Sequence, residues 1–133
     1  MSRYMLDTNT VSQLVRAHPI VSRRVASTPM GSVCISSVTA GEMLFGLAKR
    51  PDAHRLHRVV RELLLRIDVL AWTGAVAECY GPMRADLQTR GIGLSALDLL
   101  IAAHAVSADA VLVTHDAAFR NVPRLSIDDW EAA

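Results

Sequence analysis

A short apolar run near the start of the chain ends abruptly in a carboxylate and two small polar residues. Tyr4-Met5-Leu6 has the pattern of a buried strand, and Asp7-Thr8-Asn9 follows it directly. In an open α/β sheet, ligands collect beyond the carboxyl ends of the strands, because the free N–H groups of the following helices point to that edge. The run therefore predicts a strand that delivers an acid to the ligand-binding edge of a sheet.

Similar apolar runs alternate with helical patterns along the rest of the chain. Further strands are predicted at 32–36, 67–70, 110–114 and 124–127. Helices are predicted at 11–15, 20–26, 39–49, 53–66, 73–89 and 95–107, with a helical turn at 117–119. Strands joined by helices of these lengths need right-handed crossovers, so the sequence predicts an α/β fold of three layers, with a mostly parallel central sheet flanked by helices. With 133 residues and 51% hydrophobic content, we expect a single domain over residues 1–133.

Composition excludes several classes of protein. Of the 14 basic residues only Lys49 is a lysine, and arginine suits phosphate, but a net charge of +1 excludes a strongly basic nucleic-acid scaffold. No apolar run reaches the roughly 20 residues that span a bilayer, and the first residues lack a signal-peptide pattern. Cys34 and Cys79 have no metal-ligand spacing and are expected to be reduced thiols. We therefore expect a cytoplasmic protein without a membrane partner.

Four acids follow the predicted strands or open the predicted helices. Asp7 and Asp116 end strands, Glu42 follows the second strand, and Asp98 opens the most apolar helix. The carboxyl ends of parallel strands and the starts of the next helices share one edge of the sheet. Asp98 belongs to that edge because its helix must run back from it for the next strand to be parallel. The topology thus predicts one crevice with four carboxylates.

A purely structural role is the alternative for each acid taken alone. Thr39-x-x-Glu42 and Ser95-x-x-Asp98 both match the capping box, in which an acid reaches back to the first N–H of its helix. Asp7 could likewise cap the helix that follows it. Taken together, the four acids favour a site, since each pattern places its acid at the same edge.

Clustered carboxylates predict a cation. They repel one another, and an all-oxygen set favours a hard divalent ion, Mg²⁺ or Mn²⁺, that retains several waters. Such an ion activates water and braces a phosphodiester for in-line attack. His104 lies off the helical face of Asp98, and we expect it to be partly buried and to pack against its neighbours. We expect His115 to have a structural role and not a catalytic one.

Arginines lie opposite the apolar stripe of the helix predicted at 53–66. Arg58, Glu62 and Arg66 have the i,i+4 spacing of ion pairs on a solvated face. The alternative is that Arg55, Arg58 and Arg66 form a rim that contacts the backbone of a nucleic acid.

Five segments carry a family pattern: Met5–Asn9, Ile35–Glu42, Ala96–Ala105, Leu112–Asp116, and Phe119–Leu125 followed by Asp129-Trp130. In this order they resemble the PIN-domain ribonucleases and, more narrowly, the VapC toxins of bacterial toxin–antitoxin pairs. The resemblance covers nearly the whole chain. It departs from the family at His115, where many relatives carry Asn, and at Gly91–Ser95, which lacks a common arginine.

The resemblance implies a Mg²⁺- or Mn²⁺-dependent endoribonuclease that cuts transfer or ribosomal RNA. It implies a homodimer that is silenced by an antitoxin protein occupying the acidic groove, with DNA bound only through that antitoxin. The residues it assigns to catalysis and metal binding are Asp7, Glu42, Asp98 and Asp116, supported by Asn9 and Thr114.

Two other functions compete with a ribonuclease. A haloacid-dehalogenase-type phosphatase needs a second aspartate where this chain has Asn9, and it needs a downstream lysine. The only lysine of this chain, Lys49, lies in a helix that ends before a proline. A non-catalytic α/β module would keep the acids only as helix caps and would bind a protein partner.

Overall fold

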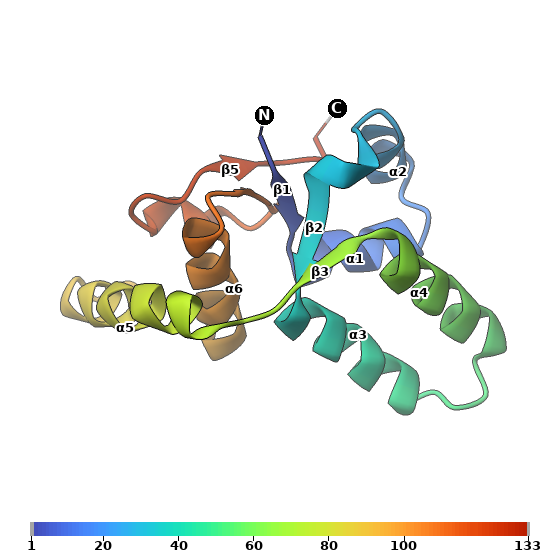
Figure 1. The fold of residues 1–133 in the computed structure, drawn as a ribbon, viewed down its shortest axis with the longest axis horizontal. Coiled ribbons are helices and arrows are strands. Elements are labelled where there is room, and N and C mark those ends of the chain that lie inside the picture. Colours follow the sequence, from blue (N-terminus) through green and yellow to red (C-terminus); the bar gives the residue numbers. More distant parts are fainter. Residues whose placement is uncertain (1, 133) are drawn as a thin grey trace.

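The structure, a computed structural model, describes residues 2–132 and has a parallel sheet at its centre (Figure 1). Within these residues the sheet has five strands in the order β3-β2-β1-β4-β5, and each neighbouring pair is parallel. The strands are β1 (Tyr4–Leu6), β2 (Val33–Ser36), β3 (Asp68–Leu70), β4 (Val111–Val113) and β5 (Ile127–Asp128). The predicted fold class is confirmed. Residues 1 and 133, the ends of the predicted domain, lie outside the described residues.

Helices connect the strands. Between residues 2 and 132 they are α1 (Thr8–Val15), α2 (Pro19–Ala26), α3 (Ser37–Ala48), α4 (His54–Arg66), α5 (Gly74–Thr89) and α6 (Ala96–Ser107). Two short 3₁₀ turns are η1 (Met30–Ser32) and η2 (Ala117–Asn121). None of the described helices combines the length and the apolar character that a bilayer crossing requires.

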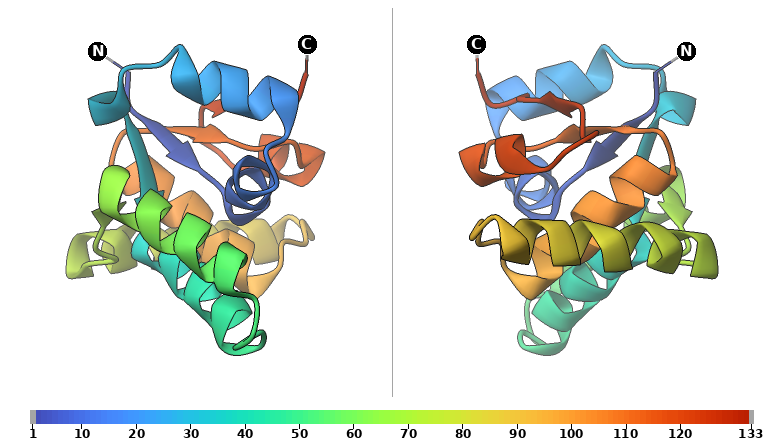
Figure 2. Two further views of the ribbon diagram at one scale, coloured as in Figure 1. Left: turned by 90° about the vertical axis from the view of Figure 1, so that its right-hand side faces the viewer. Right: turned by 90° about the vertical axis from the view of Figure 1, so that its left-hand side faces the viewer.

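Alternating side chains on the strands separate two cores, one on each face of the sheet. Met5 packs with α5 and α6, whereas its neighbour Leu6 packs with α1 and α2. Leu112 and Val113 divide in the same way on β4. This is the period of two expected for strands covered on both faces. Figure 2 shows the two helical layers, with α1, α2 and α4 on one side and α5 and α6 on the other.

Helix α3 joins the two layers at the carboxyl edge of the sheet. It follows β2 without a loop and runs away from the strand end (Figure 1). It contacts α1 and α4 from one layer and α6 from the other. A side chain on α3 can therefore face residues that both layers deliver to this edge.

The predicted starts of the last strand and of the first helix were wrong. The last strand was expected at 124–127, but β5 begins at Ile127, because Arg124 has φ 66°, a left-handed conformation that no extended strand contains. The first helix was expected from Val11 but begins at Thr8, since Asp7 already caps it. Gly91 follows the end of α5 with φ +68°, the left-handed conformation that glycine commonly adopts after a helix.

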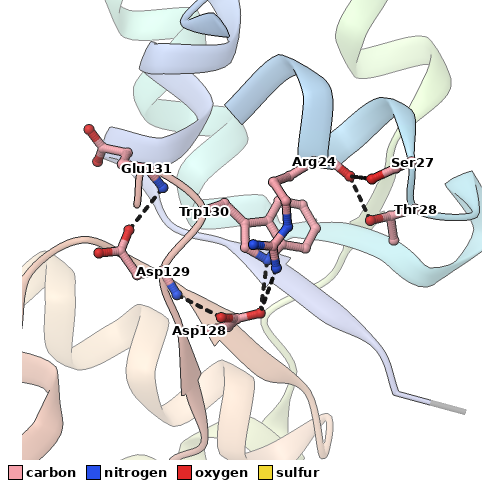
Figure 3. A network of polar contacts seen from close by, with 7 residues as sticks. All are labelled: Arg24, Ser27, Thr28, Asp128, Asp129, Trp130 and Glu131. Atoms are coloured by element: carbon pink, nitrogen blue, oxygen red, sulfur yellow. Dashed lines mark hydrogen bonds and ion pairs between the residues drawn. The ribbon is translucent and has the colours of Figure 1, made fainter. Parts of the chain in front are cut away.

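The end of the described chain is fastened to α2 through Trp130 (Figure 3). Trp130 is 2% exposed, and its indole N–H donates to Asp128 at 3.0 Å. Arg24 of α2 donates to the same carboxylate at 3.2 Å, and its guanidinium carbon lies 5.4 Å from the centre of the Trp130 ring. Tyr4 of β1 also packs against Trp130, with ring centroids 5.3 Å apart. Trp130 thus links α2, β1 and β5.

We predict that Trp130→Ala lowers the free energy of unfolding by about 3–5 kcal/mol, the usual cost of deleting a buried aromatic side chain. Trp130→Phe keeps an aromatic ring but loses the N–H donor to Asp128, so we expect a loss of only about 1–2 kcal/mol. Urea unfolding monitored by circular dichroism measures both. Equal losses in the two variants would contradict a role for ring packing.

Candidate active site

Two of the predicted site acids are helix caps. Asp7 is 3% exposed, and its Oδ1 accepts a hydrogen bond from the backbone N–H of Thr10 at 2.8 Å. Asp116 is exposed, and its Oδ1 accepts one from the N–H of Ala118 at 2.9 Å. The capping role is therefore real for both acids. In each case the described cap uses one carboxylate oxygen and leaves the other available.

Asp98 shares its electrostatic environment with Asp7 and Asp116. Burial raises the pKa of the Asp98 carboxyl above its ordinary value, and the Ser95 hydroxyl opposes this shift. The negative charges of Asp116 and Asp7 raise that pKa further. Strands β1 and β4 pair in parallel, so Asp7 and Asp116 follow them at the same edge of the sheet. The influence of both charges on the pKa of Asp98 indicates that the first turn of α6 begins near this edge. Ser95 also caps α6, accepting from the N–H of Asp98 at 3.1 Å.

Glu42 reaches the same edge from α3, but not by the predicted capping box. The cap of α3 is Ser36, whose Oγ accepts from the N–H of Val38 at 3.1 Å. Thr39 is buried one turn inside the helix, with its hydroxyl 3.4 Å from that of Thr8. The prediction failed because β2 passes into α3 without a loop, so the helix begins before Thr39. Glu42 lies in the second turn, too far along to cap, and lines a groove with Thr8 of α1.

The two predicted supporting residues differ in their surroundings. Thr114 is 2% exposed, and its hydroxyl accepts from the N–H of Asp116 at 3.0 Å. Its own N–H donates to the carbonyl of Asp128, so the sheet fixes its position. Asn9 is exposed on the first turn of α1 and lines a hollow together with Asp116. Thr114 thus orients Asp116, and Asn9 lies beside it.

The donor set fits a hard divalent ion, although its members do not yet surround one point. Among residues 2–132, no three carboxylate, imidazole or thiolate groups are close enough to hold an ion directly. The ligands available at this edge are carboxylate oxygens, and Mg²⁺ retains several waters that bridge longer gaps.

A buried histidine that the sequence did not connect to the site joins two of its helices. His104 of α6 is 2% exposed, and its Nδ1 lies 2.7 Å from the hydroxyl of Ser36. Ser36 caps the helix that carries Glu42, and His104 belongs to the helix that carries Asp98. Burial was predicted for His104, but this hydrogen bond was not. The available signal was an imidazole inside an otherwise apolar stretch, which requires a polar partner.

The predicted arginine face of α4 is solvent-exposed. Arg55, Arg58 and Arg66 are all exposed. In the described part of the chain none of them has a carboxylate within 4.0 Å, so the i,i+4 pairing of Arg58 and Arg66 with Glu62 does not form. Contact between these arginines and RNA stays a prediction.

Known proteins share both the sequence pattern and the fold. The PIN domain family matches residues 4–125. The tRNA(fMet)-specific endonuclease VapC of Shigella flexneri is 34% identical over 131 residues, which cover 98% of this chain and 99% of that protein. DNA-bound VapBC from Salmonella typhimurium superimposes with a TM-score of 0.91 at 32% identity, covering 98% of this chain and 99% of that one. VapBC2 from Rickettsia felis, bound to a fragment of its promoter, gives a TM-score of 0.88 at 27% identity, with coverages of 96% and 98%.

This agreement in sequence and fold defines the class of the protein as a PIN-domain nuclease. Within that class, the chain belongs to the VapC ribonucleases, the toxin enzymes of toxin–antitoxin pairs. The predicted class of endoribonuclease is thereby confirmed. The competing assignments, a haloacid-dehalogenase-type phosphatase and a non-catalytic module, are set aside.

We predict that Asp98→Asn raises the melting temperature in EDTA near neutral pH. The raised pKa means that the ionised carboxylate opposes folding, and the amide removes that charge. Because the pKa of Asp98 is raised, the difference in melting temperature between Asp98→Asn and wild type should shrink as the pH falls. The wild-type carboxyl then binds its proton and no longer repels the neighbouring acids. Thermal unfolding at about pH 7.5 and about pH 4 measures this. Exposed Asp52, changed to Asn, is the control; a lower melting temperature for Asp98→Asn would contradict the prediction.

We predict that His104→Leu lowers the free energy of unfolding by about 1–3 kcal/mol at neutral pH, because the buried Ser36 hydroxyl loses its hydrogen bond to the imidazole and keeps only the one from the N–H of Val38. His104→Asn keeps a polar group near the position of Nδ1 and should restore part of the loss. Urea titrations of wild type and both variants make the comparison. Identical stabilities of wild type and His104→Leu would contradict this prediction.

The wild type should also lose stability in acid through His104. Burial lowers the pKa of this imidazole, so the folded protein holds it neutral while the unfolded chain binds a proton below about pH 6.5. The stability of the wild type therefore falls as the pH drops through that range. His104→Leu lacks this proton uptake, so its deficit relative to wild type should narrow between about pH 7.5 and about pH 5.5.

Proposed function

We propose that this chain hydrolyses phosphodiester bonds in structured RNA, with Asp7, Glu42, Asp98 and Asp116 as its catalytic and metal-binding acids. Asn9 and Thr114 support these acids, and residues 1–133 act as a single PIN domain. The observation that supports the assignment is the position of three acids: Asp7 and Asp116 follow the paired parallel strands β1 and β4, and Asp98 lies in the first turn of α6. The charges of Asp116 and Asp7 also raise the pKa of Asp98. Glu42 is included because α3 brings it to the same edge.

The proposed cofactor is Mg²⁺ or Mn²⁺. When bound, such an ion supplies a Lewis acid and an activated water for attack on phosphorus. The chain's own residues hold the carboxylates in place before any ion binds. The N–H groups of Thr10 and Ala118 fix Asp7 and Asp116, and the hydroxyl of Thr114 fixes the backbone of Asp116. Preorganised ligands of this kind need little rearrangement during the reaction.

The proposed substrates are transfer RNA and ribosomal RNA, and the proposed partner is an antitoxin protein. The Shigella flexneri relative is named for its action on tRNA(fMet), which favours transfer RNA here. The Salmonella typhimurium and Rickettsia felis structures are VapBC assemblies with DNA. By analogy, an antitoxin would occupy the acidic groove of this chain, and DNA would be bound only through it. We also propose a homodimer in the cytoplasm, with Arg55, Arg58 and Arg66 as candidate RNA contacts.

We predict that the purified protein cleaves transfer or ribosomal RNA with Mg²⁺ or Mn²⁺ and loses this activity in EDTA. Asp7→Asn and Asp98→Asn should each lower cleavage by at least about 100-fold, a typical effect of losing a catalytic group. Asn at position 7 retains a cap for Thr10, so Asp7→Asn should still fold. Asp52→Asn is the matched control outside the site.

Gel electrophoresis of the RNA and sequencing of its new 5′ ends measure cleavage and identify the cut site. Circular dichroism verifies that each variant is folded. Cleavage that persists in EDTA, or full activity of folded Asp98→Asn, would overturn the proposed site.

A further inference from the structure

Helix α1 separates two hollows at the carboxyl edge of the sheet. The first, which we call the α3 groove, has a volume of about 320 Å³ and is lined by residues of α1, α3 and α4 that include Glu42 and Phe45. The second, the Asp116 hollow, has a volume of about 350 Å³ and is lined by residues that include Asn9 and Asp116. Each hollow thus reaches at least one proposed site acid. Arg16, at the end of α1, lines both of them.

The basic residues around the α3 groove are available to an anion. Arg16, Lys49 and Arg50 line the groove and are exposed. Among residues 2–132, none of these three has a carboxylate within 4.0 Å. Cations without partners next to an acidic site form the charge pattern that a phosphodiester strand needs, because its backbone contacts cations while a single linkage meets the acids.

The α3 groove also presents an aromatic ring. Phe45 is 56% exposed, which is unusual for a large apolar side chain. The ammonium group of Lys49 lies 4.6 Å from the centre of this ring. An exposed aromatic beside cations is the combination by which proteins hold single-stranded nucleic acid, the ring stacking on a base and the cations contacting phosphates.

We propose that Arg16 binds a backbone phosphate of the RNA substrate where the strand crosses α1 between the Asp116 hollow and the α3 groove. Phe45 then contacts a base further along the strand. The inference rests on the proposed ribonuclease function. Helix α1 has eight residues and rises about 12 Å from its Asp7 cap, so the phosphate at Arg16 lies about two to four nucleotides from the cleaved bond.

The charge pattern favours RNA over a protein segment as the occupant of Arg16. A protein segment that neutralised the site acids with a cation would leave Arg16, Lys49 and Arg50 without counter-charges. An RNA strand supplies those counter-charges at regular intervals along the same path. The role is substrate binding, so loss of Arg16 should raise KM and leave kcat nearly unchanged.

The test compares Arg16→Gln, Arg16→Lys and the control Arg23→Gln, which removes an exposed arginine of α2 outside both hollows. Filter binding of unfractionated tRNA is measured in the Asp98→Asn background without divalent ions, so that affinity is separated from cleavage. We expect Arg16→Gln to bind about tenfold more weakly and to reduce the slope of log affinity against log salt by about 0.7. Arg16→Lys should retain most of the affinity, and Arg23→Gln all of it.

Steady-state cleavage by the same three substitutions in the otherwise wild-type chain gives KM and kcat. Unchanged tRNA affinity of folded Arg16→Gln, or a loss confined to kcat, would overturn the proposal. Weaker binding of a co-expressed antitoxin with unchanged tRNA affinity would assign Arg16 to the protein partner instead, and would overturn it too. If the wild type cleaves no RNA with Mn²⁺, the proposed function itself fails, which this control separates from a failure confined to Arg16.

Discussion

Side-chain caps at the starts of the helices fix the edge of the sheet on which the site depends. Asp7, Ser36, Ser95 and Asp116 each accept a hydrogen bond from a backbone N–H in the first turn that follows. A helix start has N–H groups without partners, and a carboxylate there is favoured by both hydrogen bonding and the helix dipole. The free N–H groups and the helix dipoles that make these caps favourable also reduce the cost of several negative charges at one edge. Capping and ligand binding are therefore compatible roles for the same acids.

The hydrogen bond between Ser36 and His104 extends this edge across the molecule. Both side chains are buried, and a polar group buried without a partner costs free energy. Ser36 satisfies the His104 imidazole while its hydroxyl also accepts from the N–H of Val38. Ser36 sets the start of α3 and His104 sets the position of α6 beside it. Their contact therefore relates Glu42 on one helix to Asp98 on the other, although neither acid takes part in it. A histidine far from the surface thereby bears on the geometry of an exposed site.

Much of the fold could be predicted because its signals are local. The strands around Met5 and Leu112 are short apolar runs, and their alternation of partners follows from backbone geometry alone. The start of α3 could not be predicted, since Thr39 and Ser36 are both good caps and only the direct passage from β2 decides between them. The start of β5 could not be predicted either, because it depends on the left-handed backbone at Arg124, and an arginine side chain gives no sign of that conformation.

The candidate site also has features that could be predicted from the sequence and features that could not. Its four acids follow from topology, because any parallel sheet brings strand ends and helix starts to one edge. Its surroundings do not, since the pairing of His104 with Ser36 and the exposure of Arg16 at two hollows arise from helices distant in sequence. The arginines that sequence alone singled out are those of α4, whereas the groove is lined by Arg16 and Arg50. Helical periodicity identifies which residues share a face, but only tertiary packing decides what that face meets.

Opposite charges at this edge remain separated, and that separation has a physical consequence. The site acids Asp98 and Asp116 repel each other, while Arg16 nearby has no carboxylate within 4.0 Å among the described residues. Had Arg16 paired with an acid, the edge would be more stable, but neither group would be free to bind. In the proposed complex, a strand of RNA accompanied by a divalent cation would satisfy both charges together, with the cation on the carboxylates and the phosphates on the arginine. In that complex, relief of the electrostatic cost retained in the free protein would contribute to the affinity for a ligand that carries both signs of charge.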